Sequence, residues 1–318
     1  MGEKNASPDA TTRRENTPAE VNADAQATQG TSDKRPIAIL CDTTAPLSRK
    51  VADELGVTLI PMHYLVDGVR LAENYEGENG DYDTLFRNAR ILGTEAVYQN
   101  VFAERFSKLL EAGSDILCLT ISSRLSGTYR SARAAEEQLV HEGAEASRMA
   151  IVDSWTTSGG LEFLVRRAHE RVERGESLSE IAAGLKEDRK DQGIVFTVPD
   201  IDVLRRSGRL GATRGAVVGK LDRYLIMALK EGGIEDIDVA HGMRSTARAL
   251  AKQVPHELAN NGLIVTGYGE ATEVSDTLVS ILHHLYPDAN VAVRDGNPVV
   301  SLHLGVGSIS LAWRGYKG

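Results

Sequence analysis

Hydroxyl side chains gather at one junction of the sequence. The apolar run 115–121 (DILCLTI) ends there, and 127–143 follows with the apolar spacing of an amphipathic helix. The junction itself contains Ser122, Ser123, Ser126 and Gly127. A helix start has unpaired N–H groups and the positive end of the helix dipole, both of which favour an anion. Serine also caps helices. Two interpretations therefore stay open, a structural cap and an anion-binding site.

Two aspartates stand where other apolar runs end. Asp42 closes 36–42 and is followed by two threonines, and Asp153 closes 148–154 ahead of a Thr-Thr-Ser-Gly-Gly stretch. A phosphatase of the haloacid type needs a second aspartate two places after the first, where this chain has Thr44. We therefore favour caps and turns at both sites, with Asp153 in a turn that joins two domains.

A basic stretch and a histidine are further candidates. The segment LRRSGRLGATRG contains Arg205, Arg206, Arg209 and Arg214 among glycines. Such a segment is either a solvated surface or a contact for a phosphate or a partner. His303 precedes two glycines in SLHLGVGS and, on local grounds alone, is more often structural.

Standard cofactor motifs are absent from the sequence. It has no G-x-S-x-G, no G-x-x-x-x-G-K-[ST], no G-x-G-x-x-G, no H-E-x-x-H and no cysteine pair spaced for zinc. We therefore expect neither a cofactor nor a metal, and a self-contained nucleotide-using enzyme is poorly supported.

The elements that must position these residues divide into two groups. Apolar runs at 36–42, 115–121 and 148–154 alternate with helical patterns, which predicts a parallel, Rossmann-like sheet with helices on its faces. We place this N-terminal α/β domain at 36–155. Residues 156–318 predict a second α/β domain with a mixed or antiparallel sheet.

Within the second domain, 224–242 reads as two antiparallel strands around a Gly-Gly turn. The segment 291–313 reads as strands with a glycine-marked corner.

Composition limits the remaining possibilities. Residues 1–35 are nearly free of large apolar groups and predict a disordered tail. The net charge of −9 and an aromatic content of 5% disfavour nucleic-acid binding. No apolar run reaches the ~18 residues of a membrane span. Cys41 and Cys118 lie inside apolar runs, which favours buried free thiols and a cytoplasmic location.

These segments, in this order, resemble the DegV family of fatty-acid-binding proteins. The family's S-S-x-L-S-G-T-Y motif stands intact at 122–129, and its Asp-Ser/Thr-Thr strand end is present at 42–44. The stretch 204–210 resembles its G-G-R-I/V segment, and 302–313 resembles its T-H-x-G-P-G motif with valine replacing proline. The match covers about 36–316.

The resemblance implies a long-chain fatty acid held between the two domains, with its tail in an apolar tunnel. The residues implied for the carboxylate are Thr94, Ser123, Ser126, Gly127 and His303. Arg209 is implied to face a partner or a phosphate group. A separate ATP-dependent fatty acid kinase would phosphorylate the acid, so the chain itself would not be an enzyme. Transient membrane contact is also compatible with this role.

One departure bears on this site. The family's T-S-Q-P-S segment matches TEAVYQNVF, which keeps Thr94 but has Glu95 in place of serine. A glutamate beside a carboxylate site repels it, so Glu95 must point away, be neutralised, or indicate a changed ligand.

Two alternatives remain. One is a hydrolase or phosphatase with Ser126 or Asp42 as nucleophile and His303 as base. The other is a regulatory module that senses lipid without passing it on.

Overall fold

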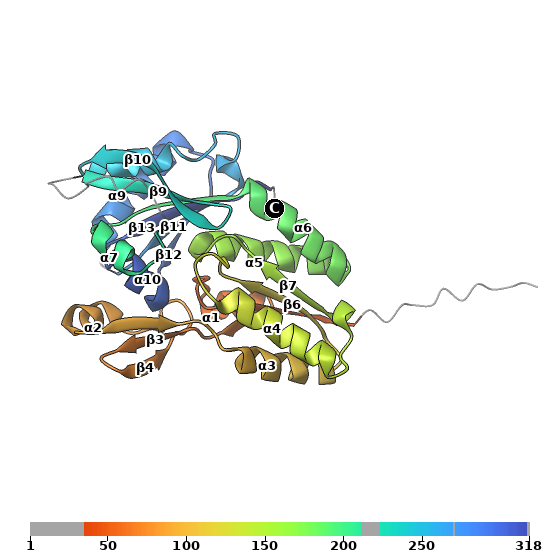
Figure 1. Ribbon diagram of the computed structural model, residues 1–318. Helices are drawn as coiled ribbons and strands as arrows, with labels where there is room; N and C mark the ends of the chain where they lie inside the picture. Colours follow the sequence, from red (N-terminus) through yellow and green to blue (C-terminus); the bar gives the residue numbers. More distant parts are fainter. Residues whose placement is uncertain (1–34, 211–222, 270, 317–318) are drawn as a thin grey trace, which may run out of the picture. The chain divides into compact units, whose positions relative to one another are not determined.

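The computed structural model describes residues 35–210, 223–269 and 271–316 (Figure 1). The expected disordered tail lies outside the described residues except for Arg35, and Arg214 of the basic stretch lies outside them as well.

The first sheet has the strand order β2-β1-β6-β7, and every neighbouring pair is parallel. Its strands are β1 (Ile37–Asp42), β2 (Val57–Ile60), β6 (Asp115–Thr120) and β7 (Met149–Asp153). The predicted parallel sheet is confirmed.

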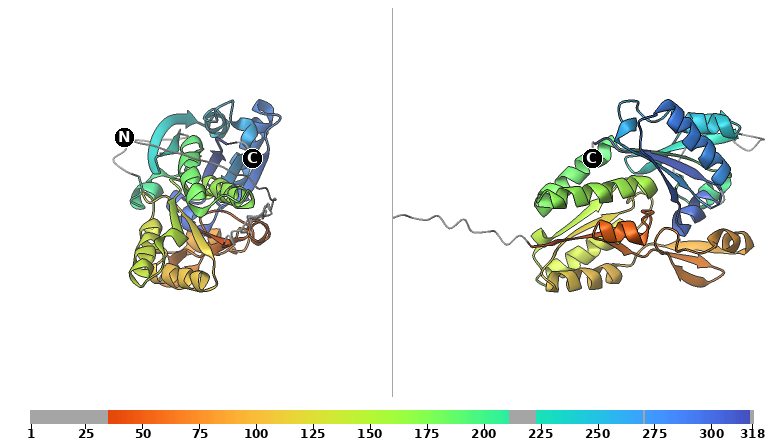
Figure 2. Two further views of the ribbon diagram at one scale, coloured as in Figure 1. Left: turned by 90° about the vertical axis from the view of Figure 1, so that its right-hand side faces the viewer. Right: turned by 180° about the vertical axis from the view of Figure 1, so that it is seen from behind.

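Helices cover both faces of this sheet. Helices α3 (Gln99–Glu111) and α4 (Thr128–His141) pack on one face, and α1 (Arg49–Glu54), α5 (Ser158–Glu173) and α6 (Leu178–Asp191) lie on the other (Figures 1 and 2). A strand alternates its side chains between the two faces, so neighbouring residues enter different cores. Cys118 therefore faces α3 and α4 while Cys41 faces α5. Both thiols are buried and free, as predicted.

The second sheet has the order β10-β9-β8-β13-β11-β12. Its strands are β8 (Gly193–Thr197), β9 (Arg223–Lys230), β10 (Gly233–His241), β11 (Leu263–Gly267), β12 (Val291–Asp295) and β13 (Ile309–Trp313). Only β11 and β12 are parallel, so the sheet is mixed, as expected. Strands β9 and β10 form the predicted antiparallel pair, with Glu231 and Gly232 in the turn at positive φ.

Helices also flank the second sheet. Helices α8 (Met243–Ala251) and α9 (Thr272–Leu285) contribute to the core on one face. Helices α7 (Ile201–Arg206) and α10 (Pro298–Leu304) pack on the other.

Helix α10 corrects the expectation that 291–313 contains only strands and a corner. The short apolar run of this segment fits either a strand or a helix. Pro298 stands in the first turn, where its missing N–H is harmless, and Gly305 ends the helix at φ 91°.

A third sheet, of antiparallel order β4-β3-β5, was not anticipated. Its strands are β3 (His63–Val66), β4 (Val69–Ala72) and β5 (Leu92–Glu95), and α2 (Tyr82–Asn88) precedes β5. Pro61 stands between β2 and β3, so this stretch of chain forms two strands in different sheets. Two 3₁₀ turns, Ala146–Arg148 and Ala259–Asn261, complete the elements of the described residues.

Helix α5 lies between the first two sheets (Figure 1). Leu161, Leu164, Val165 and Ala168 pack toward the first sheet, whereas Phe163 packs against strands of the second. The predicted boundary near residue 155 therefore falls just before a helix that both sheets share, and it stays a prediction. None of the helices in the described part of the chain is long and apolar enough to cross a membrane.

Candidate functional site

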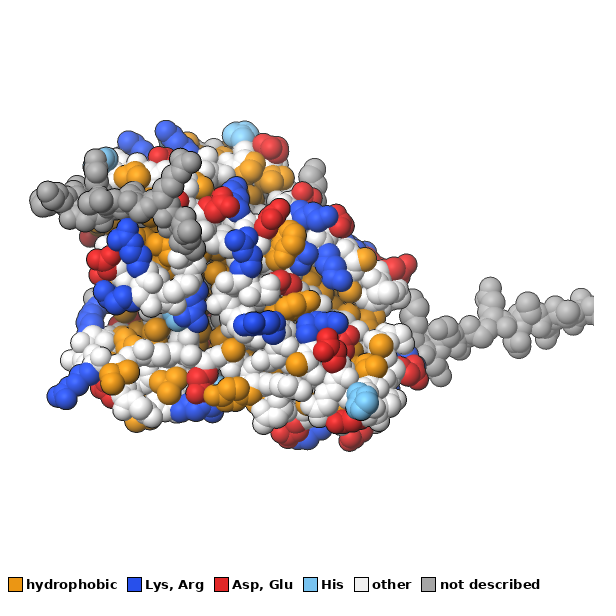
Figure 3. Space-filling view, viewed as in Figure 1, with side chains coloured by type: hydrophobic (Ala, Val, Ile, Leu, Met, Phe, Trp, Pro, Cys, Tyr) orange, Lys and Arg blue, Asp and Glu red, His pale blue; other side chains and the backbone are white. Residues whose placement is uncertain are grey.

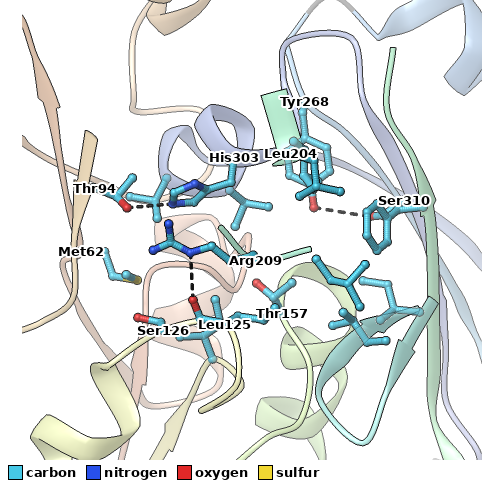
Figure 4. A pocket seen from close by; sticks show the side chains of 18 of the residues that line it. Met62, Thr94, Leu125, Ser126, Thr157, Leu204, Arg209, Tyr268, His303 and Ser310 are labelled. Carbon is cyan, nitrogen blue, oxygen red and sulfur yellow. Dashed lines mark hydrogen bonds between the residues drawn. The ribbon is translucent and has the colours of Figure 1, made fainter. Parts of the chain in front are cut away.

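A narrow cavity of about 100 Å³ lies between elements of the first and second sheets. Most of its lining is apolar and comes from β8, β9, α7, α10 and the loop after β6. The apolar lining residues include Ile121, Leu125, Ile194, Phe196, Leu204, Leu229, Ile234, Val299, Val300 and Leu304. Polar lining side chains gather toward one end, at Thr94, Ser126, Arg209 and His303 (Figure 4). The cavity thus combines an apolar interior with a polar end.

The polar end joins two segments that are far apart in the sequence. Thr94, on β5, and His303, in the last turn of α10, lie with Oγ1 and Nε2 2.7 Å apart, a hydrogen bond drawn in Figure 4. The other ring nitrogen of His303, Nδ1, is buried and has no hydrogen-bond partner among the described residues. Burial, and then the nearby charge of Arg209, lowers the pKa of His303 to about 3. The imidazole is therefore neutral at physiological pH.

Arg209 contributes a positive charge that no carboxylate offsets. Its guanidinium donates to the backbone carbonyls of Leu125, at 3.3 Å, and Ser207. No ion pair to Arg209 occurs within the described ranges 35–210, 223–269 and 271–316. Burial alone lowers its pKa, although a guanidinium stays charged at neutral pH. Sequence reasoning separated Arg209 from the head-group residues, but the structure brings it beside them (Figure 4).

Ser126 and Gly127 form the start of α4 at the cavity wall. The Ser126 hydroxyl accepts from the backbone N–H of Thr128 at 3.2 Å and lies 3.0 Å from the Thr128 hydroxyl. A cap-like role is therefore present, and the Ser126 side chain also lines the cavity. Gly127 has φ −72°, and a Cβ there would meet only ordinary contacts. Neither backbone strain nor packing requires glycine at this position.

A buried glutamate anchors the helix that carries His303. Glu73 follows β4 and is fully buried. Its Oε1 accepts from the N–H of Val299 in the first turn of α10 at 2.7 Å, and its Oε2 lies 2.6 Å from the Thr43 hydroxyl. Burial raises the pKa of Glu73 to about 8. Sequence reasoning missed this residue because a lone glutamate after an exposed strand has no distinguishing pattern.

Glu95 does not face the cavity. Successive residues of a strand point to opposite sides, so Thr94 and its neighbour diverge. The Glu95 carboxylate accepts from Arg70 Nε at 2.6 Å, and this hydrogen bond lowers its pKa. Glu95 therefore points away and is neutralised, two of the three outcomes considered from the sequence.

Other residues of the sequence motifs have structural contacts. Asp42 is buried and accepts from the N–H of Ile121 at 2.6 Å and from the Thr44 hydroxyl at 2.6 Å, which ties the ends of β1 and β6 together. Asp153 accepts from the N–H groups of Ser123 and Trp155 in its turn. Ser123, predicted for the head group, is not among the described residues that line this cavity.

Three polar lining residues were not anticipated. Thr157 lines the cavity with an Oγ1 atom that is buried and without a hydrogen-bond partner in the described structure. Tyr268 and Ser310 lie 3.4 Å apart, hydroxyl to hydroxyl, in the same wall (Figure 4). The Thr-Thr-Ser run after Asp153 was a visible signal for Thr157. Tyr268, which directly follows β11, and Ser310, in β13, had no such signal.

Comparison with known proteins agrees with this architecture. A family model described as "Uncharacterised protein, DegV family" matches residues 36–315. A DegV domain-containing protein of Clostridium perfringens is 25% identical over 283 residues, which cover 87% of this chain and 97% of that protein.

Solved structures show the same fold. A DegV lipid-binding protein from Thermotoga maritima has a TM-score of 0.76 at 24% identity, over 89% of this chain and 99% of that one. The Fatty Acid Kinase (Fak) B3 protein of Streptococcus pneumoniae, loaded with linoleic acid, has a TM-score of 0.74 at 16% identity, over 88% of this chain and 100% of that one. These chains share the two-domain α/β fold described above. Because the family model spans nearly all of the described structure, this chain belongs to the DegV family.

Proposed function

We propose that this protein binds a long-chain fatty acid in the cavity between its sheets and presents the carboxylate to a separate ATP-dependent fatty acid kinase. The observation that carries the proposal is the Arg209 guanidinium, which lines a mainly apolar cavity without a carboxylate partner among the described residues. A charge removed from water without a counter-ion is costly, and an anion at the polar end offsets that cost.

The polar end suits a carboxylate in particular. Arg209 supplies the positive charge, and the hydroxyls of Thr94 and Ser126 supply neutral hydrogen-bond donors. His303 is neutral, so it orients the Thr94 hydroxyl and adds no charge of its own. Together these donors fix the orientation of the acid, since hydrogen bonds to a charged carboxylate are stronger than hydrogen bonds between neutral groups.

The apolar interior accounts for the affinity. Each buried CH₂ group contributes about 0.8 kcal/mol, so a long acyl chain outweighs the contribution of the head group. The lining from β8, β9 and α10 presents mainly aliphatic carbon to such a chain. The Thermotoga relative is described as lipid-binding, and the Streptococcus structure contains linoleic acid.

The partner kinase is the second half of the proposal. The sequence lacks the common nucleotide-binding motifs, which favours a division of labour in which another chain supplies ATP. The Fak B3 protein, by its name, belongs to a fatty acid kinase system. A cytoplasmic location completes the proposal, because both cysteines are free thiols.

A hydrolase is less well supported by the geometry. The Ser126 hydroxyl bonds to Thr128, and the His303 Nε2 atom bonds to Thr94, so these two do not form a nucleophile–base pair. Asp42 is engaged in its own buried hydrogen bonds.

The test has two arms. Delipidated full-length protein is titrated with palmitic acid and with the matching alcohol, hexadecanol. We expect the acid to bind at least about tenfold more tightly, because only the acid provides a charge for Arg209. Equal affinity would reject the head-group assignment.

In the second arm, the loaded protein is mixed with ATP and the fatty acid kinase of the same organism. Acyl phosphate formation supports presentation. Binding without acyl phosphate formation would instead support the lipid-sensing alternative.

A further inference from the structure

A second, larger cavity lies beside the first. It measures about 790 Å³, within the range of ligand-binding pockets. Its walls come from the loops after β6 and β7, the end of α6, and strands β8 and β9. Several Lys and Arg side chains lie on the face drawn in Figure 3, over the region where Figure 1 draws the β9–β10 hairpin and α6. We call the first cavity the inner cavity and this one the outer cavity.

The two cavities share part of their walls. Ile194 of β8 and Leu229 of β9 line both of them. The ladder between these strands runs from Thr197–Ile226 to Val195–Ala228, and Ile194 and Leu229 are the next residues beyond it. The paired part of the two strands therefore ends where the cavities meet.

This shared wall is at the end of the inner cavity away from the head group. Strand β8 leads at its C-terminal end into α7 and on to Arg209. Phe196 and Ile194 lie on the same face of β8, and Ile194 is two residues farther from that end, or about 7 Å. A chain whose carboxylate lies at Arg209 thus points its far end toward Ile194 and Leu229.

The outer cavity is polar where such a chain would emerge. The Nε atom of Arg189 and both amide atoms of Gln192 are buried and have no hydrogen-bond partner among the described residues. The Arg189 guanidinium stacks 3.6 Å from the ring centroid of Trp155 and donates to the carbonyl of Asp153. Buried polar atoms without partners are costly, so a ligand that supplies hydrogen bonds is favoured here.

Resting on the proposed function, we infer that the protein also accepts long-chain acids with a hydroxyl or second carboxyl group at the far end. The acyl chain passes between Ile194 and Leu229, and its far polar group binds Arg189 and Gln192 in the outer cavity. Shorter chains end inside the inner cavity, where a terminal hydroxyl meets mostly apolar side chains.

The test compares two series of acids. Saturated acids from dodecanoic to icosanoic, and their ω-hydroxy counterparts, are titrated into delipidated full-length protein. For short chains we expect the ω-hydroxyl to weaken binding about tenfold or more, because most of the inner cavity lining offers it no hydrogen-bond partner. Above a threshold length this penalty disappears. A penalty of similar size at every length would overturn the inference while leaving the proposed function intact, whereas failure of all acids to bind would overturn both.

Variants assign the effect to residues. Gln192→Met removes the amide at similar side-chain size and is expected to restore a severalfold ω-hydroxyl penalty for long chains. Gln138→Met is the matched control, because Gln138 lies on α4 and bonds to Gln99 and Glu142 outside both cavities. Leu229→Ala is expected to shift the threshold to shorter chains. An unchanged threshold and an unchanged penalty in these variants would contradict the assignment.

Tryptophan fluorescence locates the chain end directly. The sequence has two tryptophans, and both Trp155 and Trp313 line the outer cavity but not the inner one. A bromine atom at the ω position of a long acid is expected to quench their emission, and bromine at carbon 2 of the same acid is not. Equal quenching by both, or by neither, would show that the far end does not enter the outer cavity.

Discussion

Replacing Glu73 by glutamine tests how the helix that carries His303 is anchored. Glu73 is fully buried and bonds to Val299 and Thr43. A glutamine keeps both contacts: its oxygen accepts from the Val299 N–H, and its NH₂ group donates to the Thr43 hydroxyl. That hydroxyl already accepts from the N–H of Met62 at 2.9 Å and has a second lone pair. The substitution therefore removes only the ability to ionise.

The sign and size of the effect follow from the pKa. Burial raises the pKa of Glu73 from 4.5 to about 8. Between these values the folded protein holds a proton that the unfolded chain has released, so stability is full below pH 4.5 and falls as pH rises toward 8. The slope is at most about 1.4 kcal/mol per pH unit, which sets a ceiling of about 5 kcal/mol across the window. We expect Glu73→Gln to match the wild type near about pH 4.5 and to exceed it by at least about 2 kcal/mol near about pH 8.

Urea unfolding of both proteins at several pH values measures this difference. The control is Glu78→Gln, because Glu78 is an exposed carboxylate paired with Arg49 at 2.7 Å and its pKa is lowered rather than raised. The Glu78→Gln variant should not gain stability relative to the wild type as pH rises. If the gap between wild type and Glu73→Gln is constant across pH, Glu73 is already ionised in the folded protein and the reasoning fails.

Three further changes probe the polar end of the inner cavity. Ser126→Ala removes the proposed hydrogen bond to the carboxylate and should weaken fatty-acid binding by roughly 10- to 150-fold in titrations. Ser131→Ala, farther along α4, should bind the acid normally. Equal losses in the two variants would show that Ser126 is purely structural. Arg209→Gln should weaken fatty-acid binding by a similar factor, because Arg209 lines the cavity, and acyl phosphate formation should fall in proportion. Normal binding with lost acyl phosphate formation would instead support the partner-facing role that we expected for Arg209 from the sequence. The pKa of His303 is lowered from 6.5 to about 3, so its contribution to stability is present above pH 6.5 and is lost as pH falls. His303→Gln should therefore lose less stability than the wild type on acidification. Parallel curves of unfolding free energy against pH for the two proteins would contradict this expectation.

Regular patterns in the sequence predicted much of the first sheet. The apolar run 115–121 became β6, and its neighbours β1 and β7 became parallel partners with helices on both faces. Continuous apolar runs predict these strands because both faces of a parallel sheet are buried against helices. The antiparallel turn at Gly232 was visible for a different reason, since two glycines stood between two predicted strands.

The site was only partly visible. Local patterns marked Ser126 and His303 as candidates, and the resemblance to a family added Thr94. The structure brings these residues together across more than two hundred residues of chain. Glu73 was missed because its importance depends on tertiary contacts that no local pattern encodes. Thr157 stood in a visible Thr-Thr-Ser run, but we interpreted that run as a turn. Helix α10 was missed because a short buried apolar run does not distinguish helix from strand.

The most direct measurement is native mass spectrometry of the full-length protein as purified, followed by denaturation and identification of any released lipid. We expect one fatty acid per chain, lost from the Arg209→Gln variant under the same conditions. A protein that carries no lipid, and that takes up none when delipidated and incubated with palmitic acid, would show that the inner cavity is not a fatty-acid site.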